Sequence, residues 1–210
     1  MKRHSGFTLI EVVVASAILV ILAAITIPQV LDALDKKQIE DTVDMLYELR
    51  YSISNSQGTG FMNVVRTGGS VTNSSTAPGK LTHLTEPIVA ASSTNFHNSC
   101  GPGATATWSY NATAATTWTL GGPFLDRTVS FTNGLRLPIG QMQNTLSRTA
   151  NPNTTPAYLQ LTIINVDPEM ADALDVRIDV VAGTTAGAIR YTTTSGVSTV
   201  NFLIPVPNRC

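Results

Sequence analysis

One acidic side chain lies inside a segment that is otherwise free of ionisable groups. From Phe7 to Ile27, near the start of the 210-residue chain, the one such group is the carboxyl group of Glu11. Placing a carboxylate in hydrocarbon costs about 2.5–3.5 kcal/mol even on the mildest scale, and an acid found there usually has a function. We therefore expect Glu11 to need a partner.

Other groups that could do chemistry are few, because the chain has three histidines and two cysteines. His97 and Cys100 could form half of a metal site or a nucleophilic dyad, but no second pair is nearby. Asp172, Asp175 and Asp179 could share a helix face and bind calcium, although carboxylates on one side of a helix lack the wrapping loop that calcium prefers. A solvated face is the alternative, and we predict no metal, cofactor or enzymatic activity.

The segment that positions Glu11 is long enough to cross a membrane as a helix. At about 1.5 Å per residue, Phe7 to Ile27 would span about 30 Å of hydrocarbon. Lys2 and Arg3 precede it, and their charge holds that end in the cytoplasm and sends the rest of the chain outward. A signal peptide cleaved at residues 15–17 fits poorly, because the apolar run continues through Leu22.

Around Glu11 the sequence resembles the processing site of type IV prepilins and of the pseudopilins of type II secretion. The resemblance covers Lys2 to about Pro28, and the stretch that carries it is Gly6-Phe7-Thr8-Leu9-Ile10-Glu11. It implies that prepilin peptidase, a membrane-embedded aspartic peptidase, cuts between Gly6 and Phe7 and methylates the new amino terminus at Phe7. It also implies that Glu11 attracts the terminal amine of a neighbouring subunit.

Elementary physical chemistry accounts for this pattern. Gly6 has no side chain to obstruct a protease cleft. Cleavage there frees an ammonium group at the edge of the apolar segment, and Glu11 lies four residues further along the same helix face. Opposite charges attract more strongly in a layer of low dielectric constant than in water, so the pair would set the register of a joining subunit. The alternative is a single-pass anchor whose Glu11 reaches the lipid headgroups.

A second helical segment follows Pro28, whose ring should kink or loosen the helix because it clashes with the carbonyl group four residues earlier. Residues 29–55 are amphipathic. Together with the membrane segment they predict one helix of about 45–50 residues, roughly 70 Å long. Glu40, Asp44 and Glu48 form an acidic ridge, which is either a solvated face or a contact with a basic surface of the next subunit.

The rest of the chain favours strands and turns. Alternating apolar residues predict strands over 106–110, 128–132, 135–139 and 159–163. A hairpin is expected at Asn133-Gly134, Pro138 restricts its strand to an edge, and a last hairpin turns at Ser195-Gly196. Asp167 and Pro168 predict the start of a short helix. The fold class is α+β, a long N-terminal helix packed on a mainly antiparallel β-sheet head, as in the type IV pilin-like fold.

The pattern as a whole predicts a structural subunit of a type IV pilus or pseudopilus. Its expected parts are a removed cytoplasmic leader at 1–6, a transmembrane and polymerisation helix at 7–28, an amphipathic continuation at 29–55 and a β-rich head at 56–210. We expect storage in the bacterial inner membrane, with the head in the periplasm. A separate ATPase machine would then extrude it with other copies or related pilin subunits. The alternative is an anchored periplasmic binding domain that never polymerises.

Composition argues against two other classes. Lys and Arg number 13 and Asp and Glu 14, so the formal net charge is −1, and charged residues make up 13% of the chain. An electrostatic nucleic-acid binder needs a basic stripe, and a disordered protein needs high charge. Cys100 and Cys210 are expected to pair on the oxidising side of the membrane, which would add about 4–5 kcal/mol of stability. Two buried, unpaired thiols are the alternative.

Overall fold

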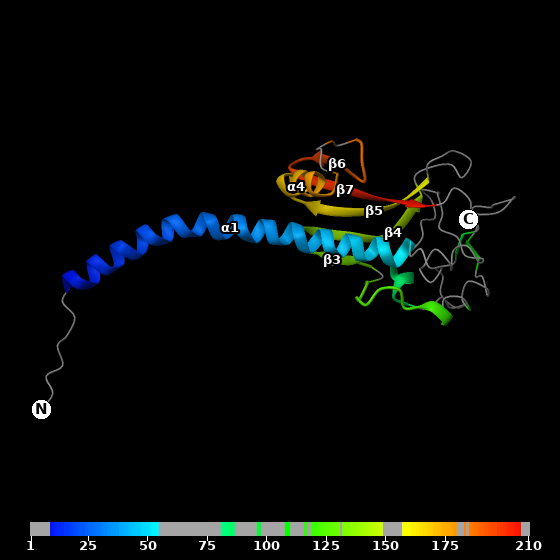
Figure 1. Cartoon of the computed structure of the whole chain (residues 1–210), viewed down its shortest axis with the longest axis horizontal. Coiled ribbons are helices and arrows are strands. Elements are labelled where there is room, and N and C mark those ends of the chain that lie inside the picture. Colours follow the sequence, from blue (N-terminus) through cyan, green and yellow to red (C-terminus); the bar gives the residue numbers. More distant parts are fainter. Residues whose placement is uncertain are drawn as a thin grey trace, which may run out of the picture. The chain divides into compact units, whose positions relative to one another are not determined.

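The computed structural model describes residues 9–54, 81–86, 96–97, 108–109, 116, 119–130, 132–148, 157–179, 183 and 185–206. The chain divides into two compact units, Met1–Gln38 and Ile39–Cys210, and the second is called the head unit below. Figure 1 shows the elements, which are α1 (Leu9–Ser54), the 3₁₀ helix η1 (Leu81–Leu84), β1 (Phe96–His97), β2 (Trp108–Ser109), β3 (Leu135–Leu137), β4 (Gly140–Arg148), β5 (Ala157–Val166), α4 (Pro168–Asp179), β6 (Ile189–Thr194) and β7 (Val197–Val206).

α1 is a continuous helix of 46 residues, which confirms the predicted long N-terminal helix. Its apolar pattern changes along its length. Up to Leu34 the apolar side chains lie on all sides and are exposed, whereas in the head unit the buried ones are Val43, Leu46, Leu49 and Ile53. Their spacing of three or four residues places these four on one side of the helix, as expected for a helix that covers a core.

Five strands of the head unit form one antiparallel sheet in the order β3-β4-β5-β7-β6. β6 and β7 form the predicted hairpin, and its turn residues Ser195 and Gly196 have φ angles of 53° and 80°. Two-residue hairpins favour such positive angles, because the twist of the turn then matches the twist of the strands. β3 ends before Pro138 and lies at an edge of the sheet, as predicted.

The prediction of a hairpin turn at Asn133-Gly134 is wrong. Ser130 and Gly134 form a single antiparallel bridge instead, and β3 pairs with β4. Gly134 has a φ angle of 72°, and a Cβ atom there would run into the carbonyl oxygen of Met142 on β4. The close approach of β4 therefore decides the conformation at Gly134, and the apolar pattern of the sequence did not predict β4.

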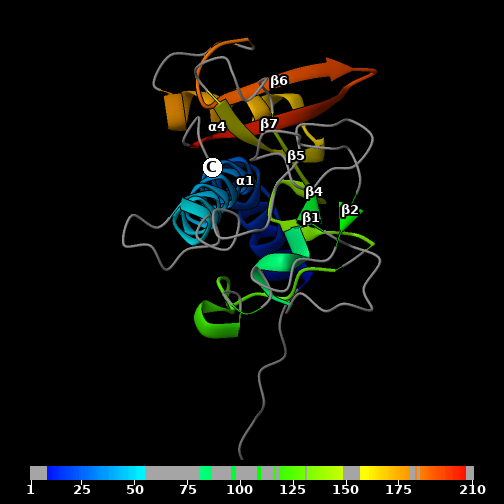
Figure 2. The same ribbon diagram turned by 90° about the vertical axis from the view of Figure 1, so that its right-hand side faces the viewer.

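The sheet has one face in the core and a second face that is mostly polar, because successive residues of a strand point to opposite sides. Leu203 of β7 lies on the second face and is also buried. On the buried face, Leu161 of β5 and Phe202 of β7 are at most 1% exposed. They share one core with Leu46 of α1 and Leu174 of α4, so both helices cover this face (Figure 2). A long N-terminal helix packed with an antiparallel sheet confirms the α+β prediction and matches the pilin-like fold.

Two polar contacts between distant parts of the chain fasten connections to this core. The side chain of Asn144 on β4, 6% exposed, accepts a hydrogen bond from the backbone N–H of Thr82 on η1 at 2.9 Å. Nε of Arg127 lies 2.8 Å from Oε2 of Glu48 on α1, with both side chains more than a third exposed. An exposed ion pair contributes about 1 kcal/mol at most, so the buried Asn144 contact is the stronger of the two.

α4 begins where the sequence predicts. Oδ1 of Asp167 accepts a hydrogen bond from the backbone N–H of Glu169 at 2.9 Å, and Pro168 is the first helical residue. An N-cap side chain of this kind satisfies one of the free N–H groups at a helix start. Proline fits the next position because its missing N–H would have no partner in the helix.

Aspartates of α4 hold the connection to β6. Asp179 accepts hydrogen bonds from the backbone N–H groups of Ala188 and Ile189 at 2.9 and 2.8 Å. Asp172 accepts a hydrogen bond from the hydroxyl group of Tyr191 at 3.0 Å. The carboxylates considered as calcium ligands therefore bind protein groups, and the described residues include no group of three His, Cys, Asp or Glu that could hold a metal ion.

Asp175 is the unusual member of this set, because it is fully buried. Its Oδ2 accepts a hydrogen bond from the backbone N–H of Gly183 at 2.6 Å, whereas its Oδ1 has no hydrogen-bond partner within the described residues. Burial raises the pKa of Asp175, the N–H of Gly183 opposes that rise, and the nearby carboxylates of Asp179 and Asp172 add to it. The neutral form of Asp175 is thus favoured more strongly in the folded state than in the unfolded chain.

Leu46→Ala should lower the free energy of unfolding by about 2–5 kcal/mol, because it leaves a cavity between α1 and the sheet. Urea unfolding of the detergent-solubilised chain, followed by circular dichroism, measures the change. Val176→Ala on α4 is the control, since Val176 is 45% exposed and its truncation should cost about 0.5 kcal/mol or less. Equal losses from the two substitutions would contradict the packing of α1 in the core.

Asp175→Asn should make stability less dependent on pH. With a raised pKa in the folded state, the contribution of Asp175 to stability is fully present below the ordinary value of 3.8 and is lost as pH rises through the raised value. Asparagine cannot ionise, so the variant should gain stability relative to wild type as pH increases from 4 to 7, in the same unfolding assay. The exposed Asp126→Asn change is the control, and a difference for Asp175→Asn that does not vary with pH would refute this account.

Candidate functional site

The first part of α1 presents a continuous apolar surface. Every large apolar side chain from Leu9 to Leu34 is more than half exposed. These side chains lie on all sides of the helix, whereas a helix on the surface of a soluble protein is apolar on one side. By length and composition α1 could cross a membrane. A surface of this size marks contact with lipid or with other apolar helices.

Glu11 is the acidic residue in the first turn of α1. The N–H groups at a helix start carry partial positive charge, which favours a carboxylate there by about 0.3–1 kcal/mol. Between Leu9 and Leu31 no other ionisable side chain occurs, and Glu11 is exposed. The carboxylate is therefore the one charged feature on a surface that would otherwise contact only apolar groups.

Two hydroxyl groups within the apolar surface bond to the helix itself. Ser16 donates a hydrogen bond to the carbonyl oxygen of Val13 at 2.9 Å, and Thr26 donates one to that of Leu22 at 3.0 Å. Serine and threonine reach the carbonyl groups three or four residues earlier in this way. Their hydroxyl groups can enter hydrocarbon without losing a hydrogen bond, because the partner moves with them. The sequence analysis assigned this role to neither residue, although a hydroxyl side chain within an apolar helix could have indicated it.

Pro28 lies inside α1, and the helix continues on both sides of it. Proline has no N–H to donate and cannot complete the usual bond to the carbonyl oxygen of Ala24. The helix therefore has a weaker point at the end of its most apolar stretch. The kink or loosening of the helix at Pro28 stays a prediction.

The remaining residues assigned to function from the sequence lie outside the described residues. They are Gly6 and Phe7, at the expected cleavage and methylation site, and the cysteines Cys100 and Cys210. The pairing of the two cysteines stays a prediction, as does the cut after Gly6. His97, considered with Cys100 as a dyad, belongs to the short strand β1.

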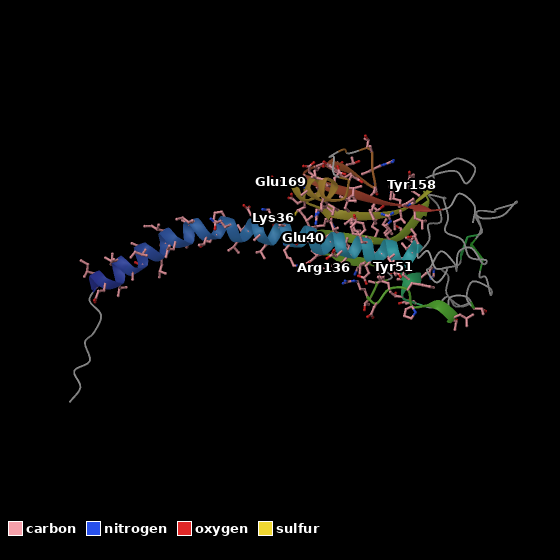
Figure 3. The ribbon with its side chains drawn as sticks, viewed as in Figure 1. Lys36, Glu40, Tyr51, Arg136, Tyr158 and Glu169 are labelled. Carbon is pink, nitrogen blue, oxygen red and sulfur yellow. The ribbon has the colours of Figure 1, made fainter. Side chains whose placement is uncertain are left out.

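The acidic ridge on α1 is divided in the structure. Glu48 forms the ion pair with Arg127 of the same chain. Glu40 and Asp44 are exposed, and Figure 3 shows Glu40 on the helix surface. Glu48 thus has a partner within the head unit, whereas Glu40 and Asp44 remain accessible to solvent.

Comparison with known proteins identifies the start of the chain. No curated protein and no solved structure matches the sequence or the fold. Residues 1–27 match the family model described as the prokaryotic N-terminal methylation motif. This match contains Gly6, Phe7 and Glu11, and it supports a processed, membrane-anchored subunit of pilin type. Residues 1–27 therefore carry the signature of type IV pilins and pseudopilins, on which the resemblance was based.

Proposed function

We propose that this chain is a structural subunit that assembles into a type IV pilus or pseudopilus filament. The observation that carries the proposal is the methylation motif at residues 1–27, on a helix whose large apolar side chains are more than half exposed up to Leu34. Such a helix is stable in lipid, and it can also pack against copies of itself. A subunit that moves from a membrane into a filament needs both properties.

Processing prepares the chain for assembly. Prepilin peptidase cuts after Gly6 and removes the leader with its basic side chains, Lys2 and Arg3. Phe7 becomes the first residue and is N-methylated there. The cut leaves an ammonium group at the edge of the apolar helix, four residues before Glu11 and on the same helix face.

Glu11 of one subunit then binds the terminal ammonium group of its neighbour. Either charge alone is costly in an apolar layer, and pairing removes most of that cost. The attraction falls with distance in a medium of low dielectric constant, so the pair fixes how far one helix slides along the next. Side-chain packing between the apolar helices supplies the remaining cohesion.

The other predicted parts have roles in this assembly. Residues 7–28 hold the subunit in the bacterial inner membrane and later form the filament core. Residues 29–55 continue the helix, and residues 56–210 form a head in the periplasm that a Cys100–Cys210 disulfide closes in the oxidising compartment. Pro28 allows the helix to stretch on packing. The partners are prepilin peptidase, other copies or related pilin subunits, and an ATPase machine that drives extrusion.

Glu11→Ala should reduce filament yield about tenfold or more, because a terminal ammonium group then enters the apolar core without a partner. Immunoblots of the sheared filament fraction and of the membrane fraction measure the yield. Asp35→Ala is the matched control, an exposed acid further along α1, and should assemble normally.

Processing and membrane insertion of the Glu11→Ala chain should remain intact, since the change adds no charge to the apolar segment. Loss of insertion would mean that the substitution damages the anchor and not the assembly step. Filaments formed at the wild-type level by Glu11→Ala would contradict the role of Glu11 in assembly, whereas a wild-type chain that forms no filaments would favour an anchored domain that never polymerises.

A further inference from the structure

The five-stranded sheet of the head unit ends at two edge strands, β3 and β6. An edge strand presents unpaired backbone N–H and C=O groups that can bind a strand of another chain, and native proteins usually shorten or cover it. β3 has three residues and is followed by Pro138, so it offers little to pair with. β6 has six residues and no proline, and Figure 2 shows it at the border of the sheet. Of these two edges, β6 is therefore the one that needs protection.

Alternate residues of β6 direct their backbone groups away from β7. In an antiparallel pair, residues that exchange hydrogen bonds with the neighbouring strand alternate with residues that do not. The carbonyl oxygen of Ala188 accepts a hydrogen bond from the N–H of Leu203 on β7 at 2.7 Å, which sets the phase of this alternation. Along the paired register, Ile189, Tyr191 and Thr193 therefore have backbone groups that point to the open edge.

Asp179, the last residue of α4, occupies one end of this edge. Its Oδ2 accepts a hydrogen bond from the outward-facing N–H of Ile189 at 2.8 Å, and its Oδ1 accepts one from the N–H of Ala188 at 2.9 Å. A Cβ atom at Gly187 would run into the same carboxyl group, so the backbone closes tightly around it. A side chain thus takes the place that a carbonyl group of an added strand would otherwise take.

The sequence of β6 suits pairing with the β6 strand of a second copy. Apart from Arg190, all its residues are β-branched or aromatic, the types that favour strands. In an antiparallel pair centred on Tyr191, Ile189 of each copy would lie opposite Thr193 of the other. The two Tyr191 rings would then be neighbours, and each Arg190 would face Thr192 and not another arginine, so no like charges would oppose the pairing.

Asp179 is incompatible with this register. The N–H of Ile189 would have to leave Asp179 and donate to the carbonyl oxygen of Thr193 in the second copy. Each carboxylate would then lose a hydrogen bond and lie against a carbonyl oxygen, whose partial negative charge repels it. Because the pair is symmetric, this cost would arise twice.

We propose that Asp179 is an edge guard, a side chain that prevents β6 of one copy from pairing with β6 of another. α1 is long and apolar enough to cross a membrane, and anchoring in a membrane brings copies together at high local concentration. An unguarded β6 would then meet other copies before they reach a filament. The edge guard concerns the head unit alone and stands whether or not the chain forms filaments.

Asp179→Ala tests the edge guard in the detergent-solubilised full-length chain. The dissociation constant of the dimer, measured by analytical ultracentrifugation, should fall about tenfold or more relative to wild type, because the outward N–H of Ile189 becomes free to pair. Asp172→Ala is the matched control. It removes another carboxylate of α4, whose partner is the hydroxyl group of Tyr191 and not the backbone, and it should leave the dissociation constant unchanged.

Thr193→Pro shows whether the added association uses the edge of β6. The N–H of Thr193 points away from β7, so proline there removes no hydrogen bond of the sheet but blocks pairing with a second copy. Asp179→Ala combined with Thr193→Pro should return to the wild-type dissociation constant. Amide hydrogen exchange at Tyr191 and Thr193 should slow in the Asp179→Ala dimer. Dimers that persist with the proline, or that show no such slowing, would refute the proposal.

Gly187→Ala disturbs the edge guard without changing Asp179. Its added Cβ atom displaces the carboxyl group, so we expect the same gain in association. Gly196→Ala is the control, because Gly196 has a similar φ angle, 80° against 84°, and no described atom within 4 Å of an added Cβ beyond its chain neighbours. Circular dichroism shows which variants are folded, and Gly187→Ala decides the question if Asp179→Ala is not. Folded variants that associate no more than wild type would overturn the edge guard.

Discussion

The free energy of hydrating the first part of α1 is the constraint on which the rest of the structure depends. Each of its large apolar side chains is more than half exposed in the single chain, and burying apolar surface stabilises by about 25 cal/mol per Å². Ser16 and Thr26 bond to the helix backbone and add little resistance to burial. The segment therefore belongs in lipid or against similar helices, and in both places Glu11 is the group that needs a charged partner.

The same helix serves a different purpose in the head unit. There one side of it, with Leu46 and Leu49 fully buried, completes the core over the antiparallel sheet. The head unit takes its stability from this core and from the contacts of α4 and η1, none of which involves the apolar surface near Glu11. The proposed exchange of lipid for neighbouring helices therefore leaves the core of the head unit unchanged.

The sequence predicted those parts of the fold that local patterns determine. The length of α1, the start of α4 at Asp167 and the β6–β7 hairpin depend on apolar spacing, capping and turn residues. β4 could not be predicted in this way, because the polar Asn144 occupies the buried position between Met142 and Leu146 and breaks the apolar alternation, and a register shift interrupts the pairing of β4 with β5. The ion pair between Glu48 and Arg127 joins residues far apart in the chain, so it becomes visible only after folding.

The residues of the candidate site differ in the same way, because some belong to a local motif and others are recognised only in the folded chain. Gly6, Phe7 and Glu11 are identified by the short motif that residues 1–27 match. The apolar spacing of α1 already indicates which side of the helix covers the core, whereas the partners of single polar side chains cannot be predicted from spacing. Likewise, Asp175 resembled its neighbours on α4 until its burial separated it from them.

The most direct test of the account is the intact mass and the first residue of the protein purified from the membranes of its native host. The account predicts a chain that begins at N-methylated Phe7, with the leader removed. A chain that still begins at Met1 would contradict it, because no ammonium group would then lie at the edge of the apolar helix for Glu11 to bind.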